Sequence, residues 1–333
     1  MKVIALEEHF ATPAIIDSWQ SVPADVRDYA VEMSAHGDNQ RLLLDLTDER
    51  VAYMDAAGID VQVLSVTTTG VQNVEPAKAV PLARAANDLM AATIHSHPDR
   101  FQGFATLPTS DPVAAAAELE RAVVDLGLNG AMIFGRHGER NLDHRDFLPL
   151  LQTANDLRAP LYLHPQSPPP PIRRAYYEGY PHDVATLFAT GGIGWHYETG
   201  VQTLRLILSG LLDRLPDLQV ILGHWGEVVL FYLDRIDLMT QPAGLSRPIS
   251  DYFTEHFWVT PSGIFSQRYL RWALEVIGAE RIMFSTDYPF ALVPDNAAPQ
   301  FLTNADLDDA DRNRIASGNW DQLCASIRRN RPA

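Results

Sequence analysis

The sequence predicts an α/β fold, a single-domain (β/α)8 barrel spanning residues 1–333. Short apolar runs, each suited to a buried strand, alternate with helical patterns along the whole chain, and eight such runs can be counted. No linker-like change of composition separates them, and the apolar fraction of 46% is enough for one large core. Regular alternation of strands and helices is typical of parallel sheets, and eight repeats without a break predict one barrel.

The strand runs share a high content of apolar residues and lie between turn-forming residues. They are residues 3–6, 59–66, 101–107, 130–134, 160–164, 218–224, 257–260 and 281–286. The first run, Val3 to Leu6, has no polar face, which suits a strand buried on both sides. The helical patterns have apolar residues at helical spacing. They cover residues 45–57, 76–97, 111 onward, 146–157, 196–212, 227 onward, 266–277 and 308–328.

Local signals mark several helix ends. Asp111 and Pro112 are a cap and a first-turn proline at the start of an alanine-rich helix, and Gly58 is a C-terminal cap. Two segments break the pattern. Residues 11–58 form an inserted segment of loops and helices after the first strand. Residues 165–181 are proline-rich, so we expect a long loop without regular structure over the end of the fifth strand.

Composition excludes several classes of partner and compartment. The net charge is -16 with no basic cluster, so nucleic acid and anionic membrane surfaces are poor partners. A single cysteine, Cys324, rules out an internal disulfide framework and fits a reducing compartment. No apolar stretch has the length of a membrane span, and the first apolar run is too short for a signal peptide. We therefore expect a soluble, cytoplasmic protein.

Polar side chains with metal-binding capacity follow four of the eight expected strands. Because barrel enzymes build their active sites at the carboxyl ends of the strands, these positions are the first candidates. They are Glu7 and His9 after the first strand, His164 after the fifth, His224 after the sixth and Asp287 after the eighth. Side chains alternate along a strand, so Glu7 and His9 point the same way. A polar group there costs several kcal/mol without a partner, and a divalent cation supplies one.

Other histidines leave alternatives open. His95 and His97 resemble a metal-binding pair, but they end a helical pattern just before Pro98, where solvated polar residues are expected. The residues Trp195, His196 and Tyr197 either line the pocket or begin a helix that packs on the barrel.

Seven motifs, spread over nearly the whole chain, carry a resemblance to a known family. They are ALEEHF at residues 5–10, MDAAGID at 54–60, PDRFQGF at 98–104, YLHP at 162–165, ILGHWGE at 221–227, PSG at 261–263 and FSTDYPF at 284–290. Together they resemble the amidohydrolase superfamily. More closely, they resemble its branch of non-oxidative decarboxylases, which includes gamma-resorcylate and 2,3-dihydroxybenzoate decarboxylases.

The resemblance implies roles for individual residues. The implied metal ligands are Glu7, His9, His164 and Asp287; the implied catalytic residues are Asp287, His224 and Glu227; and the implied substrate-binding residues are Arg235 and Phe290. Two carboxylates and two imidazoles suit one Zn²⁺ or Mn²⁺ per subunit, with Mn²⁺ slightly favoured by the resemblance. No organic cofactor is implied.

The predicted reaction is the reversible loss of CO2 from an ortho-hydroxylated aromatic acid, with Asp287 delivering a proton to the ring. CO2 or bicarbonate is then the second small-molecule partner, and relatives of this kind form homodimers or homotetramers. Two departures concern the substrate: Phe134 and Gly135 stand where such relatives often have Asn, and the proline-rich segment is particular to this chain.

Two other functions compete with decarboxylation. The same metal could activate water for hydrolysis of an ester, lactone or amide, although hydrolases of that kind usually carry His-x-His on the first strand, where this chain has Glu7. A catalytically inactive scaffold is the third alternative, and it has no need to retain buried charges.

Overall fold

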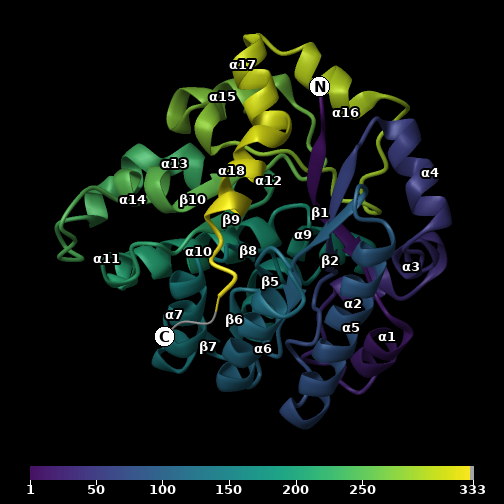
Figure 1. The fold of residues 1–333 in the computed structure, drawn as a ribbon. Coiled ribbons are helices and arrows are strands. Elements are labelled where there is room, and N and C mark those ends of the chain that lie inside the picture. The colour runs from purple at the N-terminus through teal and green to yellow at the C-terminus, as the bar shows by residue number, and fades with distance from the viewer. Residues whose placement is uncertain (331–333) are drawn as a thin grey trace.

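The computed structural model describes residues 1–330 and shows an α/β fold with parallel strands at its centre and helices around them (Figure 1). The parallel strands are β1 (Ile4–Phe10), β2 (Val61–Val66), β3 (Phe101–Gly103), β4 (Ala105–Thr106), β5 (Ala131–Ile133), β8 (Leu161–Leu163), β9 (Val220–Leu222) and β10 (Phe257–Val259). They form two sheets, with the orders β1-β2-β3 and β10-β9-β8-β5-β4, in which every pairing is parallel.

Helices connect successive strands, as parallel pairing requires. The longer ones are α5 (Pro76–Ser96), α6 (Pro112–Val124), α7 (Leu148–Leu157), α10 (Gly194–Leu208), α13 (Val229–Ile236), α14 (Ile249–His256) and α15 (Gln267–Ile277). The shorter ones in the second half are α11 (Leu211–Arg214), α12 (His224–Glu227), α16 (Ala297–Thr303), α17 (Asp309–Asn313) and α18 (Asn319–Ser326). A small antiparallel hairpin, β6 (Arg136–His137) and β7 (Arg140–Asn141), was not predicted.

Local signals proved accurate at the helix ends. Asp111 accepts hydrogen bonds from the amides of Val113 and Ala114 at the start of α6. Gly58 ends α4 (Asp48–Ala57) in the left-handed conformation, with φ of 76°. The inserted segment contains three further helices, α1 (Pro13–Trp19), α2 (Ala30–Ser34) and α3 (Gly37–Leu44).

Two expectations were wrong. The proline-rich segment was expected to lack regular structure, yet it contains α8 (Pro170–Ile172) and a π-helical turn (Arg173–Tyr177), and it leads into α9 (His182–Ala189). Its prolines at positions 165–171 lie before or within the first turn of α8, and Pro181 is the N-cap of α9. No amide donor is needed at these positions, so the prolines do not prevent a helix.

The second wrong expectation is a strand at residues 281–286, the eighth strand of the predicted barrel. Among the described residues, this segment makes only isolated parallel bridges, Ile282 with Val259 and Ser285 with Leu6. The amide of Thr286 donates to the side chain of Glu8 at 2.8 Å and not to a neighbouring strand. The third expected strand is also divided, into β3 and β4, which pair in different sheets.

The core has two parts, one on each face of the strands. The larger part lies between strands and helices, and strands such as β1 and β2 are buried along their whole length, as their apolar runs predicted. The smaller part includes Leu6 of β1, Val63 of β2, Tyr162 of β8 and Ile221 of β9. Within residues 1–330, no helix is long and apolar enough to cross a membrane.

Candidate metal centre

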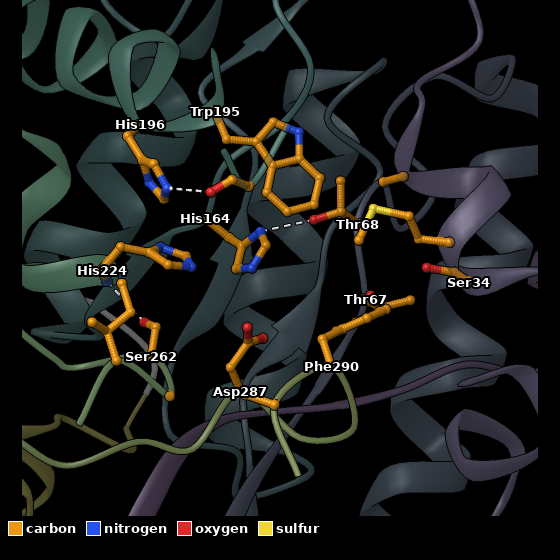
Figure 2. A pocket seen from close by; sticks show the side chains of 16 residues that line it. Ser34, Thr67, Thr68, His164, Trp195, His196, His224, Ser262, Asp287 and Phe290 are labelled. Carbon is orange, nitrogen blue, oxygen red and sulfur yellow. Dashed lines mark hydrogen bonds between the residues drawn. The ribbon is translucent and has the colours of Figure 1, made fainter. Parts of the chain in front are cut away.

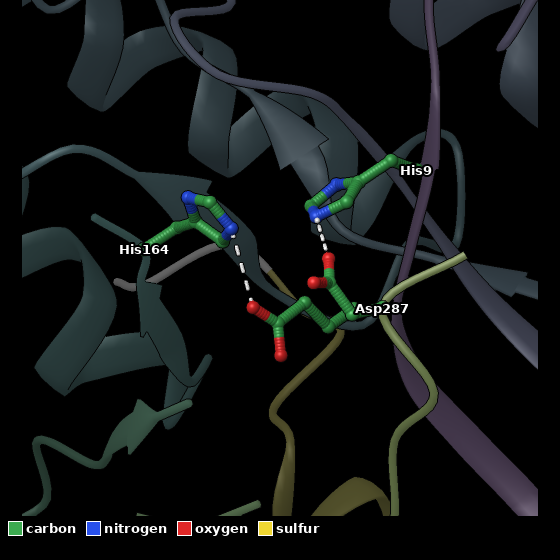
Figure 3. Close-up of side chains that lie close together, drawn as sticks. His9, His164 and Asp287 are labelled. Atoms are coloured by element: carbon green, nitrogen blue, oxygen red, sulfur yellow. Dashed lines mark ion pairs between the residues drawn. The ribbon is translucent and has the colours of Figure 1, made fainter. Parts of the chain in front are cut away.

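The four predicted ligand residues converge at one point. Glu7, His9, His164 and Asp287 each offer one ligand atom, and these atoms lie within 4.8 Å of one another. The Nε2 atom of His9 is 3.3 Å from Oδ1 of Asp287, and the Nε2 atom of His164 is 3.2 Å from Oε1 of Glu7. Figure 3 shows both imidazoles and Asp287 directed toward the same space. The sequence therefore identified the cluster from strand ends that are far apart in the chain.

Two atoms of this cluster have no hydrogen-bond partner among the described residues. They are Oε1 of Glu7 and Nε2 of His9, and both are buried. Buried polar atoms are almost always paired, since an unpaired one loses its hydration without compensation. A cation held between two carboxylates and two imidazoles would satisfy both atoms. The donor set is of the kind that binds Zn²⁺ or Mn²⁺.

Each imidazole makes its hydrogen-bond contacts through Nδ1, on the side away from the cluster, and this orients Nε2 for binding a cation. The Nδ1 atom of His164 lies 2.8 Å from Oγ1 of Thr68 and 2.9 Å from the carbonyl of Pro165, and the Thr68 hydroxyl itself donates to that carbonyl. Because a carbonyl only accepts, Nδ1 carries a proton, and this orients the ring so that Nε2 is directed at the metal centre. The Nδ1 atom of His9 contacts the hydroxyl of Ser65 at 3.1 Å, which leaves its Nε2 free as well.

The second oxygen of Glu7 is held by hydroxyl groups. Tyr162 donates to Oε2 at 2.5 Å, and Ser262 donates to the same atom. Burial by itself would raise the pKa of Glu7, but the positive charge of His224 and the contact with His164 outweigh it and hold the pKa at about 2. Glu7 therefore remains a carboxylate, with one oxygen bonded to protein and the other directed at the cluster.

Unusual backbone conformations direct three of the polar side chains. Glu7, His224 and Asp287 have left-handed φ angles of 64°, 46° and 62°, which non-glycine residues rarely adopt and which concentrate at functional sites. Gly223, next to His224, allows a close approach, since a Cβ atom there would lie 2.6 Å from Oγ of Ser262. Strand alternation predicted that Glu7 and His9 share a side, but no sequence signal revealed these backbone angles.

A second polar cluster lies beside the first. The buried carboxylate of Glu227 contacts Nδ1 of His224 through Oε1 and Nδ1 of His196 through Oε2, both at 2.7 Å. Burial would lower the pKa of His224, but the charges of Glu227 and Glu7 outweigh it and raise the pKa to about 10. His224 and Glu227 were predicted as a pair. The contact from His196 was not, because the sequence left that residue between pocket lining and helix packing.

Both clusters border a cavity of about 250 Å³, a volume suited to a single-ring ligand. Its polar wall includes His164, Asp287, His196 and His224 (Figure 2). The remaining lining residues labelled in Figure 2 are Ser34, Thr67, Thr68, Trp195, Ser262 and Phe290. Ser34 comes from α2, so the inserted segment contributes to the cavity, which the sequence did not indicate.

The two predicted substrate-binding residues lie in different places. Phe290 lines the cavity, and its ring centroid is 5.8 Å from that of His9. Arg235 is exposed on α13 and is not among the residues that line the cavity, so its role in substrate binding stays a prediction. Phe134, at one of the two departures, packs its ring 5.7 Å from the ring of His164 and so stands next to the metal centre.

Comparison with known proteins identifies a matching family and a relative that is similar over nearly the whole chain. Residues 16–319 match the family model described as amidohydrolase. Over 96% of this chain and 97% of the relative, the sequence is 40% identical to gamma-resorcylate decarboxylase of a Polaromonas strain.

Two solved structures are similar throughout. The 5-carboxyvanillate decarboxylase of Sphingomonas paucimobilis is 33% identical with a TM-score of 0.88, covering 97% of this chain and 99% of that one. A dihydroxybenzoic acid decarboxylase from a Polaromonas strain, solved with bound manganese and the inhibitor 2-nitroresorcinol, is 37% identical with a TM-score of 0.83, covering 97% of both chains.

Proposed function

This chain belongs to the amidohydrolase family, and on that premise we propose that it is a metal-dependent, non-oxidative decarboxylase. Its substrate is an aromatic acid with a hydroxyl group ortho to the carboxylate. The observation that carries the proposal is the four-residue cluster with two buried, unpartnered ligand atoms at the edge of a ring-sized cavity. The full-length relatives and structural neighbours described above are named as decarboxylases of hydroxylated aromatic acids, and they support the same chemistry.

Glu7, His9, His164 and Asp287 would hold the ion, and the manganese in a similar solved structure favours Mn²⁺ over Zn²⁺. When bound, a divalent cation supplies positive charge that attracts the substrate carboxylate and the neighbouring phenolic oxygen. No organic cofactor is needed, because protonation of the ring carbon is enough to allow loss of CO2, with the bonding electron pair returned to the ring.

Asp287 is the proposed proton donor. Its side chain borders the cavity. Burial together with the negative charge of Glu7 raises the pKa of Asp287 well above its ordinary value, whereas a bound cation would lower it, so Asp287 would take up its proton when the substrate displaces it from the ion, or receive it from His224. A protonated Asp287 donates its proton to the ring carbon that bears the carboxylate. The bond from that carbon to the carboxylate then breaks, its electron pair restores the aromatic ring, and CO2 leaves. Asp287 regains its proton, ultimately from solvent, in the same way in the next turnover.

His224 and Glu227 form a hydrogen-bonded pair beside the cavity and assist this step. The Nδ1 atom of His224 is bonded to Glu227, so its other nitrogen is available on the cavity side. A protonated imidazole there is suited to orient an anionic substrate and to exchange protons. Phe290 and Trp195 add apolar walls that suit an aromatic ring.

Product analysis in heavy water tests the proposal. Purified protein supplied with Mn²⁺ is incubated with a panel of hydroxybenzoates, and CO2 release is measured together with the mass of the ring product. We expect CO2 and one deuterium at the carbon that lost its carboxylate. Because the reaction is reversible, high bicarbonate should carboxylate the corresponding phenol. A product containing ¹⁸O from labelled water, without ring deuterium or CO2, would instead establish a hydrolase.

We also infer that the parallel strands close into one (β/α)8 barrel forming a single domain. The consecutive strands β3 and β4 join the two sheets at one side. At the other side, the segment 282–285 bridges β10 to β1. The smaller core cluster, which takes side chains from strands of both sheets, has the composition of a barrel interior. The predicted homodimer or homotetramer stays a prediction.

A further inference from the structure

Glu8 lies between two metal-centre residues, and the proposed chemistry does not use it. Its side chain bonds to Gln62 and Thr286 and not to the metal-centre residues, and it is fully buried. Its carboxylate accepts three hydrogen bonds, from the amide of Thr286 at 2.8 Å, from the hydroxyl of Thr286 at 2.6 Å and from Nε2 of Gln62 at 2.9 Å. Glu8 is thus firmly attached to the residue that precedes Asp287.

This attachment lies in a gap between two backbone hydrogen bonds, from the amide of Leu6 to the carbonyl of Phe284 and from the amide of His9 to the carbonyl of Tyr288. Between β1 and the segment containing Asp287, the ladder is a single bridge of Leu6 with Ser285, and the amide of Leu6 donates to the carbonyl of Phe284 at 2.9 Å. One residue later, the amide of Thr286 donates to the side chain of Glu8. A side chain therefore replaces the strand partner just before the backbone turns into the left-handed conformation of Asp287.

Arg50 extends the same network to His9. Its guanidinium donates to the carbonyl of His9 at 2.5 Å and to Oε1 of Gln62 at 3.2 Å, and it lies 4.4 Å from the ring centroid of Tyr288. The carbonyl of Tyr288 in turn accepts from the amide of His9 at 2.7 Å. The residues on either side of Asp287 are therefore linked to the residues around His9, behind the face that forms the cavity.

We infer that Glu8 is a positioning residue of the metal centre: through Thr286 it sets the place of Asp287 relative to Glu7 and His9. β1 supplies the ligands Glu7 and His9, and the segment 282–287 supplies Asp287. Little backbone pairing holds these two segments in register. Glu8 supplies that register with its two hydrogen bonds from Thr286, and the third, from Gln62 of β2, holds the Glu8 carboxyl group in place. This inference rests on the proposed metal-dependent function and adds a role for a residue that touches neither ion nor substrate.

Metal affinity of the metal-free protein tests the inference, measured by calorimetric titration with Mn²⁺ and by the Mn²⁺ electron paramagnetic resonance spectrum. The variants are Glu8→Gln, which keeps the shape but changes one acceptor into a donor, and the pair Thr286→Val and Thr286→Ser. Valine lacks the hydroxyl, whereas serine retains it. Leu150→Ala, a truncation in the buried face of α7, is the control for general loss of stability.

We expect Glu8→Gln and Thr286→Val to weaken Mn²⁺ binding by about 10- to 100-fold, as loss of outer hydrogen-bond partners does in other metal sites. Thr286→Ser should restore the affinity, and Leu150→Ala should leave it unchanged. Glu8 and Thr286 act through one contact. The double variant should therefore lose little more Mn²⁺ affinity than the more strongly affected of the two single variants. If Glu8→Gln does not fold, the valine and serine pair decides the question alone.

Unchanged Mn²⁺ affinity in folded Glu8→Gln and Thr286→Val would overturn the positioning role and leave the proposed function intact. Equal weakening by Leu150→Ala would also overturn it, because general stability would then explain the effect. A wild-type protein that binds neither Mn²⁺ nor Zn²⁺ would instead remove the metal centre, and with it both proposals.

Discussion

Two polar clusters border the same cavity, and they differ in how their atoms are paired. In the metal centre, Oε1 of Glu7 and Nε2 of His9 have no hydrogen-bond partner among the described residues. In the second cluster, both carboxylate oxygens of Glu227 contact imidazole nitrogens, of His224 and His196, at 2.7 Å. Each cluster combines imidazoles with carboxylates, so residue type alone does not separate them.

The difference in pairing separates their functions. The first cluster needs a positive ion to satisfy its two unpaired buried atoms. In the second cluster, the carboxylate and the imidazoles satisfy one another through hydrogen bonds. The charge of Glu227 contributes to the raised pKa of His224, about 10, so this imidazole keeps its proton at neutral pH. A protonated imidazole has no lone pair on either nitrogen for a metal. We propose on this basis that the first cluster binds a cation and that the second orients the substrate or supplies protons.

The largest expected effect comes from breaking the first cluster. Replacing His164 with alanine removes one nitrogen ligand, so Mn²⁺ affinity should fall by more than about 100-fold and turnover should drop to background. Elemental analysis of the purified variant and CO2 release check both parts. Full metal content in His164→Ala would show that the ion lies elsewhere.

The next largest effect is expected for Asp287→Asn. An amide cannot deliver a proton to the ring, so turnover should fall by about 10²- to 10⁴-fold, the range for losing general acid–base help. The assay is CO2 release together with deuterium at the ring carbon. A variant that still decarboxylates near the wild-type rate would assign the proton to another group.

His224→Asn sharpens the comparison most directly, because it should separate turnover from metal content. We expect turnover to fall by about 10²-fold through loss of a proton-handling and orienting group, while the protein retains its metal. Elemental analysis beside the kinetic assay measures the two quantities. Loss of metal in this variant would place His224 among the ligands.

The smallest effect is expected for His196→Gln. Glu227 would keep its contact with His224 and lose at most one hydrogen bond, so we expect the lower end of the range for hydrogen bonds to charged groups, about 1.5 kcal/mol. A loss of turnover of roughly 10-fold follows, because 1.4 kcal/mol corresponds to a factor of ten. Steady-state kinetics with Mn²⁺ in excess measure it. A loss as large as that of His224→Asn would make His196 an equal member of the second cluster.

Local patterns in the sequence were enough for much of the site. Glu7 and His9 could be placed on one side of β1, because alternation along a strand is a property of neighbouring residues. His164, His224 and Asp287 could be added because each follows a buried apolar run, and parallel strands bring such ends together. Caps at Asp111 and Gly58 were equally local, so they were correctly predicted.

Features that depend on contacts between distant residues were decided by the tertiary structure. His196 contacts Glu227 across 31 positions, and Glu8 contacts Thr286 across 278. Neither contact has a sequence spacing that could reveal it. The same dependence applies at the end of the eighth expected strand, where the amide of Thr286 pairs with the side chain of Glu8 and not with a neighbouring strand.

The sequence by itself thus determined which side chains stand at the strand ends, because burial and alternation act over a few residues. Which atoms of those side chains are left without a partner was decided only by the folded structure. Hydrogen-bond pairing depends on every group packed around an atom, and for Glu7 these include Tyr162 and Ser262, which are 155 and 255 positions away. The sequence could therefore name the four ligand residues, but only the tertiary structure shows which of their atoms face the proposed ion.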